Sequence, residues 1–159
     1  MKNTDVGTQE SVMVAVTDQP LDAIDIMAFV ADDSSGSTVL FSGTVRDHSP
    51  GRQGVTRLEY EAYEGVVTTK IREVVDEALG QWPIVKVAAV HRTGVLGLGE
   101  SAVIVAVSTA HRADGFPACR YIIDELKHRV PIWKKEHWEG GSEWVREDLH
   151  HAGEDSPER

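Results

Sequence analysis

Segments rich in Val, Ile and Thr alternate with segments of helical periodicity along most of this chain, and this order restricts the possible folds more than any other feature. β-Branched runs favour strands because their side chains pack well on a pleated surface. Some of these runs follow one another directly, whereas others are separated by a helical segment. The combination predicts an α+β protein with a mixed or antiparallel sheet flanked by helices.

Several runs have the composition and length of strands. In one of them Leu58, Tyr60 and Ala62 alternate with polar residues, which predicts one buried face. The glycine-rich segments 47–54 and 94–99 predict a loop and a tight connection. The first dozen residues are polar and show no pattern. The expected strands are 12–16, 38–45, 55–63, 84–91 and 102–110.

Apolar residues recur at helical spacing in other segments, and each apolar stripe predicts the side of a helix that faces the core. The expected helices cover about 18–30, capped by Asp18 with Pro20 in the first turn, then 65–79 and 114–129. A proline two residues beyond the last helix ends it. The three stripes consist of Leu21, Ile24, Met27 and Ala28; of Val67, Ile71, Val74, Val75 and Ala78; and of Phe116, Cys119, Ile122, Ile123 and Leu126.

The length of 159 residues, with 41% hydrophobic residues, suits one globular domain that folds without a disulfide or a metal. We expect this domain to cover residues 1–147 and the acidic segment 148–159 to be a disordered tail. The chain has no apolar run of the ~18 residues that a membrane helix needs, and no signal-peptide pattern. The single Cys119 excludes an intramolecular disulfide, and its helical spacing indicates a core residue. These features predict a cytoplasmic protein.

The net charge of -10 is unevenly distributed. Residues 1–25 and residues 147–159 each carry a net charge of -4, so the remaining chain is almost neutral. Within it, residues 127–135 contain four cations and no acid. A basic segment in an acidic protein suits a small anionic ligand better than nucleic acid, which usually needs a broad basic face. A solvated basic face is the simpler alternative.

Cationic side chains also occur where the expected elements end. Arg46 ends one strand, His111 and Arg112 follow another, Lys127 lies in the last helical turn, and Lys134 follows the proline turn. The helix dipole alone favours a cation at Lys127, and His111 has the simpler role of a hydrogen-bonded strand-end residue. Two arginines and two lysines around one cavity would instead hold a phosphate, and a lysine there suits general acid or base catalysis. The histidines lack paired metal-ligand spacing, so neither a metal nor a cofactor is expected.

A series of motifs lies in a fixed order between about residues 21 and 145. They are FSGTVRDH at 41–48, LEYEAY at 58–63, VHRTG at 90–94, STAHR at 108–112 and LKHRVPIWKKE at 126–136. In combination they closely resemble the large, catalytic subunit of molybdopterin synthase, the MoaE family. Several ordered motifs make this resemblance far more specific than any one of them.

The resemblance implies an α/β hammerhead fold and a sulfurtransferase, molybdopterin synthase. Members of that family add two sulfurs to cyclic pyranopterin monophosphate and form the dithiolene of molybdopterin, a step of molybdenum cofactor biosynthesis. The sulfur arrives as the C-terminal Gly-Gly thiocarboxylate of a small ubiquitin-like carrier subunit, whose tail enters the pocket. Two large subunits form a homodimer at the centre of a heterotetramer. Because the sulfur arrives activated on a partner, such an enzyme needs no nucleophilic thiol of its own.

The resemblance also implies roles for individual residues. Lys127 matches the essential active-site lysine of the family, and Lys134 matches its second pocket lysine. Arg112 belongs to a His-Arg pair whose Arg can come from the neighbouring subunit. The loop 49–54 and both termini have no implied role. The other positions that match substrate-binding residues are Thr44, Val45, Arg46, His111, Lys135 and Glu136.

Two other classes of function fit the same residues. One is a non-catalytic module that binds a phosphorylated small molecule or a nucleotide through these cations. The other is a purely structural partner of a ubiquitin-like protein, which would have no need of two lysines beside a Trp-Pro turn. Conversion of the pterin precursor with a thiocarboxylated carrier separates the catalytic class from both.

Overall fold

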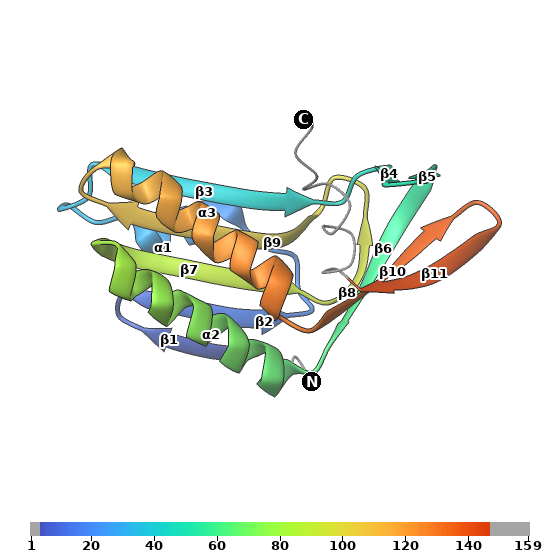
Figure 1. Ribbon diagram of the computed structural model, residues 1–159, viewed down its shortest axis with the longest axis horizontal. Coiled ribbons are helices and arrows are strands. Elements are labelled where there is room, and N and C mark those ends of the chain that lie inside the picture. Colours follow the sequence, from blue (N-terminus) through green and yellow to red (C-terminus); the bar gives the residue numbers. More distant parts are fainter. Residues whose placement is uncertain (1–3, 147–159) are drawn as a thin grey trace, which may run out of the picture.

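A five-stranded mixed sheet forms the larger part of the molecule (Figure 1), whose computed structural model describes residues 4–146. Among its neighbouring strands, β2 and β7 run parallel and the other pairs are antiparallel. The α+β class with a mixed sheet is confirmed. The strand order is β1 (Thr4–Gln9), β2 (Val12–Thr17), β7 (Ile84–Arg92), β9 (Ser101–Thr109) and β3 (Ser37–Thr44).

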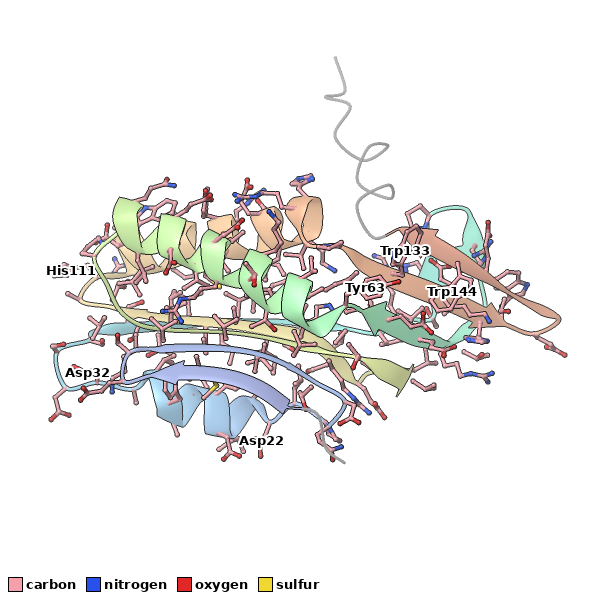
Figure 2. The ribbon with its side chains drawn as sticks, turned by 90° about the horizontal axis from the view of Figure 1, so that it is seen from below. Asp22, Asp32, Tyr63, His111, Trp133 and Trp144 are labelled. Atoms are coloured by element: carbon pink, nitrogen blue, oxygen red, sulfur yellow. The ribbon has the colours of Figure 1, made fainter. Side chains whose placement is uncertain are left out.

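Helices cover both faces of this sheet (Figure 2). α2 (Glu64–Gln81) and α3 (Arg112–Arg129) pack on one face, and α1 (Ala23–Val30) packs on the other. Side chains of a strand point alternately to the two faces. Val103, Val105 and Val107 of β9 therefore pack in the core under α2 and α3, whereas Ile104 and Ala106 pack in a second cluster under α1.

A second, four-stranded antiparallel sheet projects from one end of the first (Figure 1). α3 ends at Arg129, and the chain turns at Pro131 and enters this sheet directly. A short hairpin of β4 (His48–Ser49) and β5 (Arg52–Gln53) lies beside it. The sheet consists of β11 (Gly141–Arg146), β10 (Ile132–Trp138), β6 (Val55–Ala62) and β8 (Gly94–Gly97).

The buried stripe of α2 is confirmed, and that of α3 is confirmed except at its first residue, Phe116. Val67, Ile71, Val74, Val75 and Ala78 of α2 are at most 1% exposed. In α3, Cys119, Ile122, Ile123 and Leu126 are buried as well. The expected buried face of β6 is confirmed for Leu58 and Tyr60, and Ala62 is half-buried.

The first helix starts later than expected. Asp22, not Asp18, caps it, because its carboxylate accepts hydrogen bonds from the backbone N–H of Ile24 (2.9 Å) and Asp25 (3.3 Å). Pro20 therefore precedes the helix. The expected apolar stripe was wrong as well, because Ile24, Met27 and Ala28 are exposed and Ile26 and Val30 are the buried residues.

The expected face of the last helix was wrong at one position. α3 begins at Arg112, two residues before the expected start, and His111 is its N-cap residue. Phe116 is 62% exposed and lines a surface depression together with Thr38 and Leu40 of β3.

Four segments carry strands that composition did not indicate. Residues 4–9 pair with β2, and the glycine-rich residues 94–97 pair with β6. The expected loop at 47–54 contains the β4–β5 hairpin, and β10 and β11 follow Pro131. Pairing to a neighbouring strand overrides weak local propensity in each case. The expected tail, 148–159, lies outside the described residues, and no helix within residues 4–146 is long and apolar enough to cross a membrane.

Candidate active site

The junction of α3 and β10 places two lysines at one cavity. Lys127 lies in the last turn of α3, where the carbonyl ends of the helix favour a cation. Lys134 lies near the start of β10, beyond the turn at Pro131. Both side chains line a cavity of about 310 Å³, so the structure brings together the lysines that the sequence singled out.

The end of β3 supplies a third cation to the same cavity. Thr44 and Arg46 line it, whereas Val45 between them is 4% exposed and points into the core. The backbone fixes this strand end, because Val45 N–H donates to Glu100 O (3.0 Å) and Val45 O accepts from Gly99 N–H (2.8 Å). The cavity therefore contains three cations from separate segments, which are Arg46 just after β3, Lys127 on α3 and Lys134 on β10.

Glu136 is the acid of the cavity, and it is fully buried at 0% exposure. Its Oε2 accepts hydrogen bonds from Ser49 Oγ (2.8 Å) and Arg52 Nη1 (3.0 Å). Its Oε1 lies 3.8 Å from Lys134 Nζ. A buried carboxylate needs such partners, because an isolated charge in the interior is very costly.

Ser49 and Arg52 are site residues that sequence reasoning missed. They belong to the segment 49–54, to which the sequence assigned no role. Their contacts with Glu136 join positions more than 80 residues apart in the chain. A contact between residues so far apart leaves no pattern in the local sequence. The only local indication is that a polar residue stands at each end of the tight turn.

Lys135 faces away from the cavity. Because strand side chains alternate, Lys134 and Glu136 point to one side of β10 and Lys135 to the other. Its Nζ lies 5.3 Å from the centroid of the Trp144 ring. Trp144 and Trp133 are about two-fifths exposed on this outer face, where Figure 2 shows them near Tyr63.

His111 and Arg112 lie at the far end of the large sheet. They line a separate depression with Phe116 and the start of β3. The lysine cavity adjoins the opposite end of β9, which is nine residues long and thus spans roughly 25 Å. Figure 2 shows His111 at the opposite end of the molecule from Trp133, the neighbour of Lys134. Within one chain, the His-Arg pair and the lysines do not share a cavity.

Cys119 is a core residue, as its spacing predicted. It is 3% exposed, and its Sγ donates to Val105 O at 3.6 Å. Burial raises the pKa of the Cys119 thiol to about 11, so the nucleophilic thiolate is disfavoured at neutral pH.

Three cations around one buried and paired acid define an anion-binding cavity. Its volume of about 310 Å³ lies in the range of roughly 300–1,000 Å³ that is typical of small-molecule sites. Guanidinium and ammonium groups together suit a phosphorylated ligand. Within residues 4–146, no three His, Cys, Asp or Glu side chains are grouped to hold a metal ion.

The fold and the cavity thus define an α+β protein with a cavity whose charges suit a small anionic ligand. Residues 16–129 match the MoaE protein family, and the chain belongs to this family. It is 43% identical to the molybdopterin synthase catalytic subunit of Thermoplasma volcanium over 81% of this chain and 93% of that protein. It is 44% identical to molybdopterin synthase catalytic subunit 1 of Mycobacterium tuberculosis, over 82% of this chain and 88% of the relative.

A solved structure agrees with this assignment. The crystal structure of molybdopterin synthase from Staphylococcus aureus superposes with a TM-score of 0.78 and is 37% identical. The match covers 83% of this chain and 96% of that one. The family resemblance drawn from the sequence motifs is confirmed, and so is the fold class that it implied.

Proposed function

We propose that this chain transfers sulfur from the C-terminal thiocarboxylate of a small ubiquitin-like carrier to cyclic pyranopterin monophosphate, which forms the dithiolene of molybdopterin. The observation that carries the proposal is the convergence of Arg46, Lys127 and Lys134 on one cavity. The relatives named as molybdopterin synthase catalytic subunits support the same reaction. We place the reaction in the cytoplasm, with which a single, buried, reduced cysteine agrees.

The charges of the cavity suit the approach of two anions. The precursor carries a phosphate and the carrier ends in a thiocarboxylate, so the two reactants repel each other. Fixed cations in a partly enclosed site offset this repulsion before the reaction begins. Arg46 keeps its charge at any physiological pH and suits the phosphate, and Lys134 suits the phosphate or the pterin oxygens.

We assign the proton-transfer role to Lys127. It projects from a long helix that is packed on the sheet, so its backbone has a fixed position beside the cavity. Addition of sulfur and elimination of oxygen require a group that gives and accepts protons. A lysine can do both, since its ammonium form gives a proton and its amine form accepts one, whereas the guanidinium of Arg46 cannot release a proton near neutral pH.

The remote His-Arg pair fits a homodimer. Because His111 and Arg112 lie roughly 25 Å from the lysine cavity of their own chain, we propose that they complete the cavity of a second copy. Each dimer would then contain two composite sites and bind one carrier at each, as in a heterotetramer. Lys135, which faces Trp144, lies outside the cavity and has a supporting role in binding at most.

Reconstitution tests the proposal. The purified chain is mixed with the precursor and a preformed thiocarboxylated carrier, and product is followed in a single turnover. We expect conversion that depends on both the chain and the thiocarboxylate. Binding of the precursor without conversion would instead identify a non-catalytic binding module, and binding of the carrier alone would identify a structural partner.

A further inference from the structure

One arginine ties the β4–β5 hairpin to the strand that carries Lys134. Arg52 Nη1 donates to Glu136 Oε2 on β10 (3.0 Å), and Arg52 Nη2 donates to Glu143 Oε2 on β11. The guanidinium also lies over the ring of Trp138, with Cζ 3.9 Å from the ring centroid. Contact with both strands raises the pKa of Arg52, chiefly through Glu143 and then through Glu136. Arg52 therefore fixes the hairpin to the small sheet at three points.

The same hairpin forms a wall of the cavity. His48, Ser49 and Pro50 line it, whereas Arg52 lies behind them. Ser49 Oγ donates to the same Glu136 oxygen as Arg52, at 2.8 Å. The position of this wall is thus coupled to the orientation of one buried carboxylate.

The orientation of Glu136 in turn affects Lys134. The oxygen Oε2 receives the hydrogen bonds from the hairpin, and the other oxygen, Oε1, lies 3.8 Å from Lys134 Nζ. This separation is about 1 Å longer than a direct charge-assisted hydrogen bond. Because a second cation already interacts with the carboxylate, Glu136 attracts the Lys134 ammonium less closely than an isolated carboxylate would.

We propose that Arg52 is a positioning residue that holds Glu136 so that the Lys134 ammonium is presented to the anionic substrate. The inference rests on the proposed function for its substrate, cyclic pyranopterin monophosphate. Arg52 acts through Glu136 and touches no reacting atom. Without Arg52, the buried carboxylate draws the Lys134 ammonium into a close ion pair and weakens the binding of the substrate phosphate.

The geometry requires an arginine at this position. The guanidinium has separate N–H groups for Glu136 and for Glu143, and its flat face stacks on Trp138. A lysine carries one ammonium and cannot make these contacts together. Arg52→Lys should therefore recover part of the loss seen with Arg52→Ala.

The test separates substrate binding from the chemical step. With saturating thiocarboxylated carrier, Arg52→Ala should raise KM for the precursor by roughly tenfold to a hundredfold, as expected for a misplaced binding group, and change kcat much less. The matched control is Arg57→Ala. Arg57 also contacts β10, with Nη2 3.4 Å from His137 Nδ1, but it is exposed and lies outside the cavity. The control should leave both constants close to wild type.

A double-mutant cycle tests the route through Arg52. Glu143→Gln removes the charge that Arg52 contacts on β11 and leaves Glu136 unchanged. It should therefore raise KM for the precursor, but by less than Arg52→Ala does. Adding it to Arg52→Ala should have almost no further effect, because Glu143 acts through Arg52. Glu143→Gln and Arg52→Lys also carry the test if Arg52→Ala does not fold. Unchanged KM in these folded variants, or fully additive effects, would overturn the proposal.

Calorimetry with inorganic phosphate distinguishes this inference from the proposed function. Arg52→Ala should bind phosphate more weakly than both wild type and Arg57→Ala in the absence of any carrier. If wild type binds phosphate but converts no precursor, the proposed function is wrong, and weaker phosphate binding by Arg52→Ala still supports the positioning role. Equal phosphate affinity in all three proteins, together with equal KM, would contradict it.

Discussion

At the scale of single residues, the cavity depends on the alternation of side chains along β10. Lys134 and Glu136 face the cavity, and Lys135 between them faces Trp144. Adjacent lysines in one basic segment thus have different surroundings, and we infer different tasks for them. Residue type alone does not separate them, because the composition of this segment does not indicate the strand whose alternation does so.

Lys127 is the residue for which we expect the largest effect on the reaction. Lys127→Ala should abolish product formation while the carrier still binds, because a protein interface does not depend on one side chain at its edge. Lys127→Arg should also fail, since guanidinium keeps the charge but does not release a proton near neutral pH. The measurement is single-turnover conversion, with carrier binding measured in parallel. Near-normal rates for Lys127→Arg would reduce Lys127 to an anion contact.

Cys119 should matter for stability and not for sulfur transfer. Cys119→Ser places a hydroxyl among apolar neighbours, so the free energy of unfolding should fall by about 1–3 kcal/mol. Denaturant titration measures this loss. The folded fraction should convert precursor at close to the wild-type rate, and a well-folded but inactive Cys119→Ser would show that the thiol takes part in the reaction.

At the scale of elements, α2 and α3 are held together at the end that carries Lys127. Arg129 Nη1 and Nη2 donate to the two oxygens of Glu77 (2.6 and 2.9 Å), and Tyr121 Oη donates to Oε2 (2.7 Å). Arg129, and to a smaller extent Tyr121, lower the pKa of Glu77 to about 2. This network lies two residues from Lys127 and orients the last turn of α3.

The Glu77 network predicts a pH dependence of stability. Because the pKa of Glu77 is lower in the folded than in the unfolded chain, its contribution is complete above about pH 4.5 and is lost as the pH falls towards about 2. Glu77→Gln should therefore lose less stability than wild type between pH 5 and pH 2 (roughly the linkage window). The measurement is thermal unfolding across this range.

A control on the same helix sharpens this comparison. Glu73 pairs with Lys70 on the exposed surface (3.2 Å), so Glu73→Gln should follow the wild-type pH dependence. If the stability of Glu77→Gln and of wild type fell equally steeply with pH, Glu77 would not be the source of the pH dependence.

The elements themselves show where sequence reasoning succeeds. The stripe of α2 is correct because an 18-residue helix repeats its apolar pattern several times. α1 has eight residues, and the choice between Asp18 and Asp22 as cap depends on side-chain geometry that the sequence does not contain. β10 is rich in charged residues and becomes a strand through its pairing with β6. The contact of Arg52 with Glu136 depends on the pairing of β10 with β6. Because the sequence did not predict this pairing, it could not predict the contact either.

At the scale of the whole molecule, the candidate site residues lie at both ends of the large sheet. The lysine cavity lies at the end that adjoins the small sheet, and His111 and Arg112 lie at the other. The family resemblance allowed for an arginine from a neighbouring subunit, and the length of β9 gives a physical reason for one.

Mixed dimers test this arrangement. Lys127→Ala and Arg112→Ala should each be inactive alone. If every site combines Lys127 of one chain with Arg112 of the other, a dimer of the two variants has one intact site, and a random mixture should recover about a quarter of wild-type turnover. The variants are unfolded together, refolded and assayed. No recovery in a mixture that sediments as dimers would show that the His-Arg pair serves another purpose.

The register in which the chain enters β10 after the turn at Pro131 decides which of the two neighbouring lysines faces the cavity. A strand that slips by one residue exchanges its two faces. If one residue were deleted between Val130 and Lys134, Lys135 would point into the cavity and Lys134 would take the outward-facing place of Trp133. An amine would still reach the substrate, but Glu136 would leave the interior, and Ser49 and Arg52 would lose their acceptor. A one-residue shift of the strand would therefore keep a positive charge in the cavity, because Lys134 and Lys135 are adjacent. It would not keep the contacts of Glu136, so this carboxylate specifies the native register.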